Sequence, residues 1–309
     1  MKNIYIASCV PNGGILRYEM SESGKLKFID KTPLDRPMYM TEYDGRLYVI
    51  VREYDGKNSG VVSYKINADG VLSDMQEHGS AMGECGCHIL ADECGIYCAN
   101  YISGSVSHLP DTVIDHNFGE KVAHVHFVGA TPDKKYVCVC DLGLDTVFVY
   151  DRELKLVSQA KVPEGDGVRH LVFSEDGKYV FSANELGETA SAFSYSDGRL
   201  ALLDTVKLLP DDYTGKKAAA AIRIHNGKIY VSSRDVNLIS KLEFDGKTLK
   251  KVSDFDCGGY FPRDFDFVGE YVVSANQLGN TVTVVKPTDS GAKLIDKVEA
   301  EAPLCVHIV

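Results

Sequence analysis

The chain of 309 residues contains no tryptophan, and 17 tyrosines and 12 phenylalanines supply its aromatic side chains. No apolar run is long enough to span a membrane, and residues 1–9 lack the apolar stretch and cleavage site of a signal peptide. Basic residues are outnumbered, with a formal net charge of −11, which argues against binding to a nucleic-acid backbone. We therefore expect a cytoplasmic protein without nucleic-acid or membrane partners.

The nine cysteines form no Cys-x-x-Cys pair, and most lie within apolar runs. This pattern predicts buried free thiols in a reducing cytosol rather than a disulfide framework. Cys85, Cys87 and His88 lie close together, but their spacing matches no standard zinc pattern. The sequence also has no Gly-rich phosphate loop. We therefore expect neither a metal nor another cofactor.

A tyrosine begins the second strand of each of seven similar units, and the gaps between these tyrosines are 43, 49, 39, 43, 51 and 41 residues. The tyrosines are Tyr5, Tyr48, Tyr97, Tyr136, Tyr179, Tyr230 and Tyr271. Each tyrosine after the first follows a short turn, usually with Asp or Gly, and precedes a polar loop and a further strand. Short antiparallel strands that repeat with a period in the forties are typical of propeller blades.

The two ends of the chain indicate how the ring closes. Residues 3–8 read as a second strand without a first strand before them, and residues 302–309 resemble the first strands of other units. The sequence therefore predicts an all-β, seven-bladed β-propeller with four antiparallel strands per blade, in which the C-terminal strand joins the N-terminal blade. Closure of this kind removes exposed sheet edges. We expect residues 1–309 to form a single domain without a helix of appreciable length.

Repeat geometry places equivalent residues of different blades side by side around the central channel. Arg169 and His126 each lie seven residues before the aspartate of the turn that follows them. Arg263 fills the same slot in a blade whose turn is shorter. We expect these three residues to converge at one mouth of the channel, with Cys87 and His88 nearby.

A second ring is expected from the loop that follows the second strand of each blade, and Glu185 and Arg234 are its ionisable members. Structural roles remain alternatives, because Arg169 can tie blades together and Glu185 can be its partner in a salt bridge. His126 can be an ordinary strand residue, and His170 is interpreted as structural. Several charged groups aimed at one mouth nevertheless favour a binding site, because without a ligand they repel or lose hydration.

The sequence resembles the propeller-type lactonases in several stretches. These are Ala-His-Val-His at 123–126, Asp-Leu-Gly-Leu-Asp at 141–145, Val-Arg-His-Leu at 168–171, Asn-Glu-Leu at 184–186, Ala-Ile-Arg-Ile-His at 221–225, Ser-Arg at 233–234, Pro-Arg-Asp-Phe at 262–265 and Ala-Asn-Gln at 275–277. The resemblance is close from about residue 80 onward and looser in the first two blades. The usual proline before the arginine of the fifth-blade motif is Val168 here.

The family includes bacterial 6-phosphogluconolactonases and fungal carboxy-cis,cis-muconate cyclases, which are propellers without a metal requirement. The resemblance implies that His126, Arg169 and Glu185 occupy catalytic positions. It also implies that a second arginine, either Arg263 or Arg234, binds the substrate. His88 is a further candidate for substrate binding.

The leading hypothesis is metal-independent hydrolysis of a small anionic sugar lactone, 6-phosphogluconolactone, as in the pentose phosphate pathway. Such a reaction needs a base for water, either Glu185 or His126, and a charge that stabilises the oxyanion, for which Arg169 is suited. One alternative is a lactonising cycloisomerase of muconate type, in which the same arginines bind carboxylates. Another is a binding propeller without catalysis. The sequence leaves the oligomeric state open.

Overall fold

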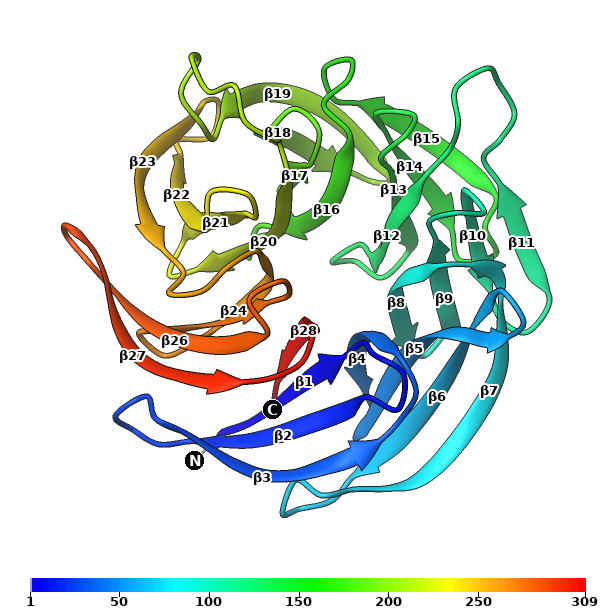
Figure 1. Cartoon of the computed structure of the whole chain (residues 1–309). Helices are drawn as coiled ribbons and strands as arrows, with labels where there is room; N and C mark the ends of the chain where they lie inside the picture. The colour runs from blue at the N-terminus through cyan, green and yellow to red at the C-terminus, as the bar shows by residue number, and fades with distance from the viewer. Residues whose placement is uncertain (1) are drawn as a thin grey trace.

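The computed structural model describes residues 2–309 as seven four-stranded antiparallel sheets arranged in a ring (Figure 1). Blade 1 consists of β28 (Pro303–Ile308), β1 (Lys2–Ser8), β2 (Gly14–Met20) and β3 (Leu26–Pro33). Blade 2 consists of β4 (Pro37–Tyr43), β5 (Arg46–Asp55), β6 (Asn58–Ile66) and β7 (Leu72–Glu84). Blade 3 consists of β8 (Gly86–Asp92), β9 (Gly95–Asn100), β10 (Ser105–His108) and β11 (Thr112–Asp115).

The remaining four blades follow in chain order. Blade 4 consists of β12 (Val125–Ala130), β13 (Tyr136–Asp141), β14 (Thr146–Asp151) and β15 (Leu156–Lys161). Blade 5 consists of β16 (Val168–Phe173), β17 (Tyr179–Asn184), β18 (Thr189–Ser196) and β19 (Arg199–Lys207). Blade 6 consists of β20 (Ala219–His225), β21 (Lys228–Ser233), β22 (Leu238–Phe244) and β23 (Leu249–Asp256), and blade 7 of β24 (Pro262–Val268), β25 (Tyr271–Asn276), β26 (Thr281–Thr288) and β27 (Gly291–Glu299).

The core lies between the faces of neighbouring blades. The second strands are almost fully buried, as in β17, whereas the fourth strands alternate between exposed and partly buried residues, as in β15. This difference explains the sequence pattern, because a strand covered on both faces reads as a continuous apolar run and an outer strand does not. The prediction of seven four-stranded blades is confirmed. Residues 2–309 contain no helix that is long and apolar enough to cross a membrane.

The ring is closed by β28, which pairs with β1 near both ends of the chain (Figure 1). Ile308 pairs with Ile4 and Val306 pairs with Ile6, as the sequence predicts. A buried carboxylate secures this strand from the side of blade 7, because Asp264 accepts a hydrogen bond from the Val306 amide at 2.9 Å. Asp264 also pairs with Arg223 of blade 6 at 2.6 Å. The closing strand is therefore joined to two further blades.

Every blade has a β-bulge at the same end of its innermost strand. In blade 5, Val168 pairs with Asn184 and His170 pairs with Ala183, so Arg169 has no partner in the ladder. Similar register shifts occur between the first and second strands of the other six blades. Because a bulge releases one residue from the alternation of the strand and re-aims its side chain, seven such residues surround one mouth of the channel.

Candidate active site

Two rings of seven residues form this mouth, one residue from each blade in each ring. The inner ring holds the bulge residues of the first strands, which are, from blade 1 to blade 7, Leu304, Met38, Cys87, His126, Arg169, Ala220 and Arg263. The outer ring holds, in each blade, the residue directly after the last residue of the second strand that pairs with the first strand, as Glu185 follows Asn184. From blade 1 to blade 7 these residues are Cys9, Arg52, Tyr101, Leu142, Glu185, Arg234 and Gln277. The rings bring together residues that are far apart in the sequence.

Glu185 lies between two arginines. Its Oε2 is 2.9 Å from Arg169 Nε, and its Oε1 is 2.7 Å from Arg234 Nη2. Both arginines also donate to backbone carbonyls of blade 6, Arg169 Nη1 to Ala220 at 2.8 Å and Arg234 Nε to Ala218 at 2.9 Å. The three side chains are therefore held rigidly across the gap between blades 5 and 6.

The protonation states follow from burial and from these charges. Burial raises the pKa of Glu185, but the guanidinium groups of Arg234 and Arg169 outweigh it and hold the pKa below its ordinary value. Burial and the charge of Arg263 lower the pKa of Arg169 to about 9, so Arg169 remains protonated at neutral pH. The site therefore contains an ionised carboxylate between two guanidinium ions.

Two further arginines at the mouth have no carboxylate partner in the part of the chain that the structure describes, residues 2–309. The strongest polar contact of Arg263 is with Gln277 Oε1, at 3.4 Å from its Nη1. Arg52 Nη2 lies 3.4 Å from the Cys85 sulfur, a weak acceptor. Within residues 2–309 the two rings thus hold four arginines against one carboxylate, in a chain whose formal net charge is −11. This local excess of positive charge favours an anionic ligand.

The histidines of the channel are neutral. Burial, together with the charges of Arg169 and Arg263, lowers the pKa of His126 well below its ordinary value. The ring of His170 packs edge to face against that of His126, with centroids 5.2 Å apart, and its two ring nitrogens are 3.2 and 3.4 Å from Arg169 Nη1. His88 lies deeper, 4.2 Å from the ring of Tyr39, and burial lowers its pKa to about 3.

Within residues 2–309, several buried polar atoms of the mouth and the channel below it have no hydrogen-bond partner. At the mouth they are the Nε atoms of Arg52 and Arg169 and the Nδ1 atom of His126, and in the channel the Nδ1 atom of His88. Arg169 Nε is close to Glu185, but its N–H does not point toward the carboxylate oxygen, so the contact is electrostatic. Buried polar atoms are nearly always satisfied in folded proteins, and a group of unsatisfied ones therefore indicates where a polar ligand binds.

Metal ligands do not cluster here. Among residues 2–309 no three or more His, Cys, Asp or Glu side chains are arranged to hold a metal ion. The nine cysteines are free thiols, and six of them are buried. The expectation of burial is wrong for Cys94, which is exposed, because it occupies the turn between β8 and β9 rather than a strand. Cys9 and Cys85 are partly buried at the mouth.

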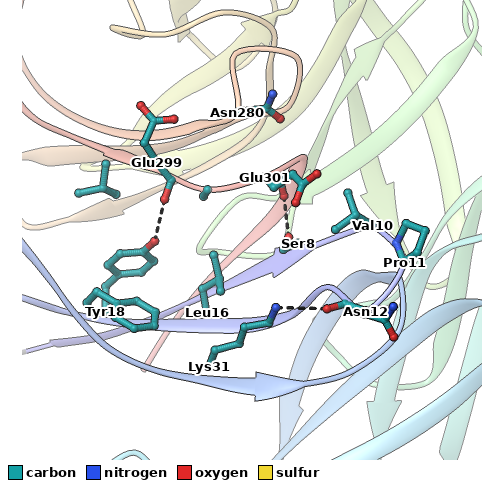
Figure 2. A pocket seen from close by; sticks show the side chains of 13 residues that line it. Ser8, Val10, Pro11, Asn12, Leu16, Tyr18, Lys31, Asn280, Glu299 and Glu301 are labelled. Atoms are coloured by element: carbon teal, nitrogen blue, oxygen red, sulfur yellow. Dashed lines mark hydrogen bonds between the residues drawn. The ribbon is translucent and has the colours of Figure 1, made fainter.

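A separate cleft of about 650 Å³ lies between blades 1 and 7, outside the two rings (Figure 2). Its polar groups contact one another: Ser8 Oγ donates to the Glu301 carbonyl at 2.6 Å, and Lys31 Nζ donates to the Asn12 carbonyl at 3.2 Å (Figure 2). It contains neither a histidine nor an arginine. The cleft lacks the charged, unsatisfied groups of the mouth, so we do not place the chemistry there.

The structure brings His126, Arg169, Glu185, Arg234 and Arg263 to the same mouth. It places His88 one residue farther along its strand than the ring position, packed among aromatic side chains rather than beside the arginines.

Sequence reasoning missed Arg52, which occupies the outer-ring position of blade 2. It also interpreted His170 as structural, although His170 contacts Arg169. Alignment of the end of each second strand would have indicated Arg52, because it follows the apolar run that begins near Tyr48 as Arg234 follows the run that begins near Tyr230.

The bulged ring and its mouth define the class of protein: a seven-bladed β-propeller with a group of arginines at one end of its channel. Residues 3–308 match the family described as lactonase, 7-bladed beta-propeller, and the chain belongs to this family. An uncharacterized protein of Staphylococcus saprophyticus is 30% identical over 331 residues, which cover 96% of this chain and 95% of that protein.

Solved structures show the same fold. A periplasmic gluconolactonase from Pseudomonas aeruginosa superposes with a TM-score of 0.91 at 25% identity, over 100% of this chain and 99% of that chain. A Bacteroides fragilis protein, provisionally named a 6-phosphogluconolactonase, superposes with a TM-score of 0.86 at 24% identity, over 100% of this chain and 98% of that chain. The family and the Pseudomonas aeruginosa gluconolactonase together support a lactonase-type hydrolase.

Proposed function

We propose that this protein hydrolyses a sugar lactone, with 6-phosphogluconolactone as the expected substrate and 6-phosphogluconate as the product. The observation that carries the proposal is the set of four arginines against one carboxylate at the mouth. The lactone carbonyl becomes an oxyanion in the tetrahedral intermediate, and the acid product is an anion as well. A preorganised cationic mouth stabilises both.

Arg169 is the group that we assign to the oxyanion. It is 2% exposed, it is fixed by the Ala220 carbonyl and by Glu185, and its Nε–H has no acceptor. A fixed donor that needs no reorganisation stabilises charge as that charge develops. Its planar fork matches an oxyanion better than an ammonium group does.

His126 is the group that we assign as the general base. Its ring is neutral and its Nδ1 has no partner, whereas both oxygens of Glu185 lie beside arginines. A water molecule attacks the carbonyl carbon and gives its proton to His126 Nδ1. The intermediate then expels the ring oxygen, which takes the proton from His126 and leaves as the hydroxyl group of the open acid.

The charges of the arginines also connect binding with catalysis. Arg169, Arg263 and Arg234 contribute to the low pKa of His126, after burial. An anionic substrate offsets these charges, so its binding raises the basicity of His126 at the moment when a base is needed. Glu185 is ionised and positions Arg169 and Arg234, and we assign it no proton transfer.

A panel of lactones tests the proposal. The purified protein is given glucono-δ-lactone, its 6-phosphate and a muconate, and the release or uptake of acid is followed with a pH indicator. We expect lactone hydrolysis above the spontaneous rate, and a loss of 10²- to 10⁴-fold in His126→Asn, as is typical of a removed general base. Glu243→Gln, a substitution at a partly exposed residue of blade 6 outside the two rings, serves as the control. Turnover of the muconate alone would replace the proposal with a cycloisomerase.

A further inference from the structure

Two arginines of the mouth stand out from all others in the chain. Of its ten arginines, seven form ion pairs with Asp or Glu within residues 2–309. The three others are Arg52, Arg199 and Arg263, and Arg199 is exposed to solvent. Arg52 and Arg263 are partly buried, so their charges lose hydration without gaining a carboxylate. Such an arrangement is unfavourable unless a ligand supplies the missing anion.

The two arginines lie on either side of blade 1, Arg263 in the inner ring of blade 7 and Arg52 in the outer ring of blade 2. Blade 1 contributes only Leu304 and Cys9 to the rings, so no charged group separates them. Burial raises the pKa of the Cys9 thiol against the opposing charges of Arg52 and Arg263, and after burial the charge of Arg52 is among those that lower the pKa of Arg263. The two arginines therefore act on one region of the mouth.

The local contacts of Arg52 leave it available to a ligand. Its Nη2 meets only the sulfur of Cys85, and its buried Nε has no acceptor. The neighbouring Glu53 does not neutralise it, because Glu53 pairs with Arg36 at 3.4 Å. Arg36 also pairs with Asp35 at 2.6 Å, so it provides an example of a satisfied arginine in the same region.

Arg52 is also accessible. It lines a cleft of about 490 Å³ between blades 2 and 3, together with Glu53, Gly56, Lys57, Glu84, Cys85 and Ile102. Glu84 is the second carboxylate near this cleft, and it forms no ion pair with Arg52 within the described residues. A substrate group that enters the mouth therefore reaches Arg52 without displacing an existing salt bridge.

We propose that Arg52 and Arg263 form a second anion-binding subsite, which holds an acidic group of the substrate away from the carbonyl at Arg169. The identity of the substrate rests on the proposed function, but the subsite itself does not. An oxyanion with several acceptor atoms, a phosphate monoester or a carboxylate, suits two guanidinium forks. In this arrangement Arg234 stays paired with Glu185. The second arginine that binds the substrate is therefore Arg263 rather than Arg234, and Arg52 binds the same acidic group.

Binding without turnover tests the subsite. Inorganic phosphate and malonate are titrated into the full-length protein by calorimetry at low ionic strength, where screening is weak. We expect Arg52→Gln and Arg263→Gln to weaken binding of at least one probe by about 10-fold or more, the size of a lost charge-assisted hydrogen bond. Arg46→Gln is the matched control, because Arg46 begins the same strand at its opposite end and pairs with Asp74 at 2.8 Å.

Kinetics separates the subsite from the reaction. For a substrate whose acidic group occupies the subsite, Arg52→Gln raises KM by about 10-fold and leaves kcat nearly unchanged. For the plain lactone, KM rises by less than for the acidic substrate, because no acidic group occupies the subsite. Arg52→Lys keeps the positive charge and should retain part of the anion binding. Its comparison with Arg52→Gln distinguishes loss of the charge from a folding defect.

The outcomes are distinct. Weaker phosphate binding in Arg52→Gln supports the subsite even if no lactone is turned over. Absence of lactone turnover would reject only the proposed function. Weaker binding of malonate alone also supports the subsite and points to a dicarboxylic substrate. Unchanged binding of both probes in Arg52→Gln, or an equal loss in Arg46→Gln, would overturn the subsite.

Discussion

Glu185→Gln removes one charge from the mouth and keeps the shape of the side chain. In the parent protein the carboxylate lies 2.9 Å from Arg169 Nε and 2.7 Å from Arg234 Nη2. The variant leaves four arginines at the mouth without a counter-ion. We expect it to be folded but less stable, to position Arg169 less well, and to bind anions more tightly.

The expected loss of stability follows from the burial of the Glu185–Arg169 ion pair. Loss of one partner of a buried ion pair costs about 3–5 kcal/mol, and Glu185 is 19% exposed, so the lower end applies. A change of about 3 kcal/mol lowers the melting temperature by roughly 5 °C or more in a chain of this size. Folding lowers the pKa of Glu185, so its ionised carboxylate stabilises the protein fully above the ordinary pKa of 4.5. This stabilisation is lost as the pH falls through the lower pKa of the folded state. The melting temperatures of the parent protein and of Glu185→Gln should therefore converge as the pH falls below 4.5.

The assay compares melting and kinetics in the same preparations. If Glu185 positions the arginines, kcat falls by about 10-fold, because Arg169 is less well fixed. If Glu185 is the general base, kcat falls by 10²- to 10⁴-fold, the range typical of a lost base. Glu243→Gln, which removes a partly exposed ion pair with Lys228, is the control for charge alone. A loss above 10³-fold in a stable Glu185→Gln protein, with His126→Asn still active, would refute our assignment of the base.

Three further outcomes are expected. Arg169→Lys should lower kcat by about 10²-fold or more on any lactone that the protein hydrolyses, and an unchanged kcat would remove Arg169 from the oxyanion site. Asp264→Asn should lower the melting temperature measurably, because the Val306 amide and Arg223 lose a buried anionic partner, and an unshifted melting curve would contradict this role. Dialysis against a chelator should leave lactone hydrolysis intact, whereas restoration of a lost activity by a divalent ion would show that a metal takes part.

The architecture could be predicted from the sequence because it depends on local signals repeated seven times. A tyrosine in the first half of the second strand, a turn such as the one at Gly177, and a polar loop recur along the chain, so an error in one repeat is corrected by the others. Gly177 itself has a φ of 68°, a conformation that glycine adopts without a steric penalty. The closing strand was predictable because residues 302–309 resemble the other first strands.

The site was predictable in part. His126 and Arg169 share a distance to the following turn, and Arg263 fills the same position in a blade whose turn is shorter, so the three residues could be assigned to one ring. The bulges that aim these side chains depend on hydrogen-bond register, which the residue types do not reveal. Arg52 was missed because Val51, rather than an Asn or Asp, precedes it and because β5 continues to Asp55 as a long hairpin. The shared use of Glu185 by Arg169 and Arg234 depends on side-chain orientation across two blades.

The closing strand also has a consequence for biosynthesis. Chains are made from the N-terminus, at about 5–20 residues per second, and completed parts begin to fold during synthesis. Residues of the mouth from Cys9 to Gln277 exist before Pro303–Ile308 has been made, but β1 has an unpaired edge until then. Leu304, the inner-ring residue of blade 1, also arrives with this strand. A chain that stops before β28 therefore carries nearly every residue of the mouth in an open ring, where its exposed edge makes it a target for aggregation or degradation before the mouth is complete.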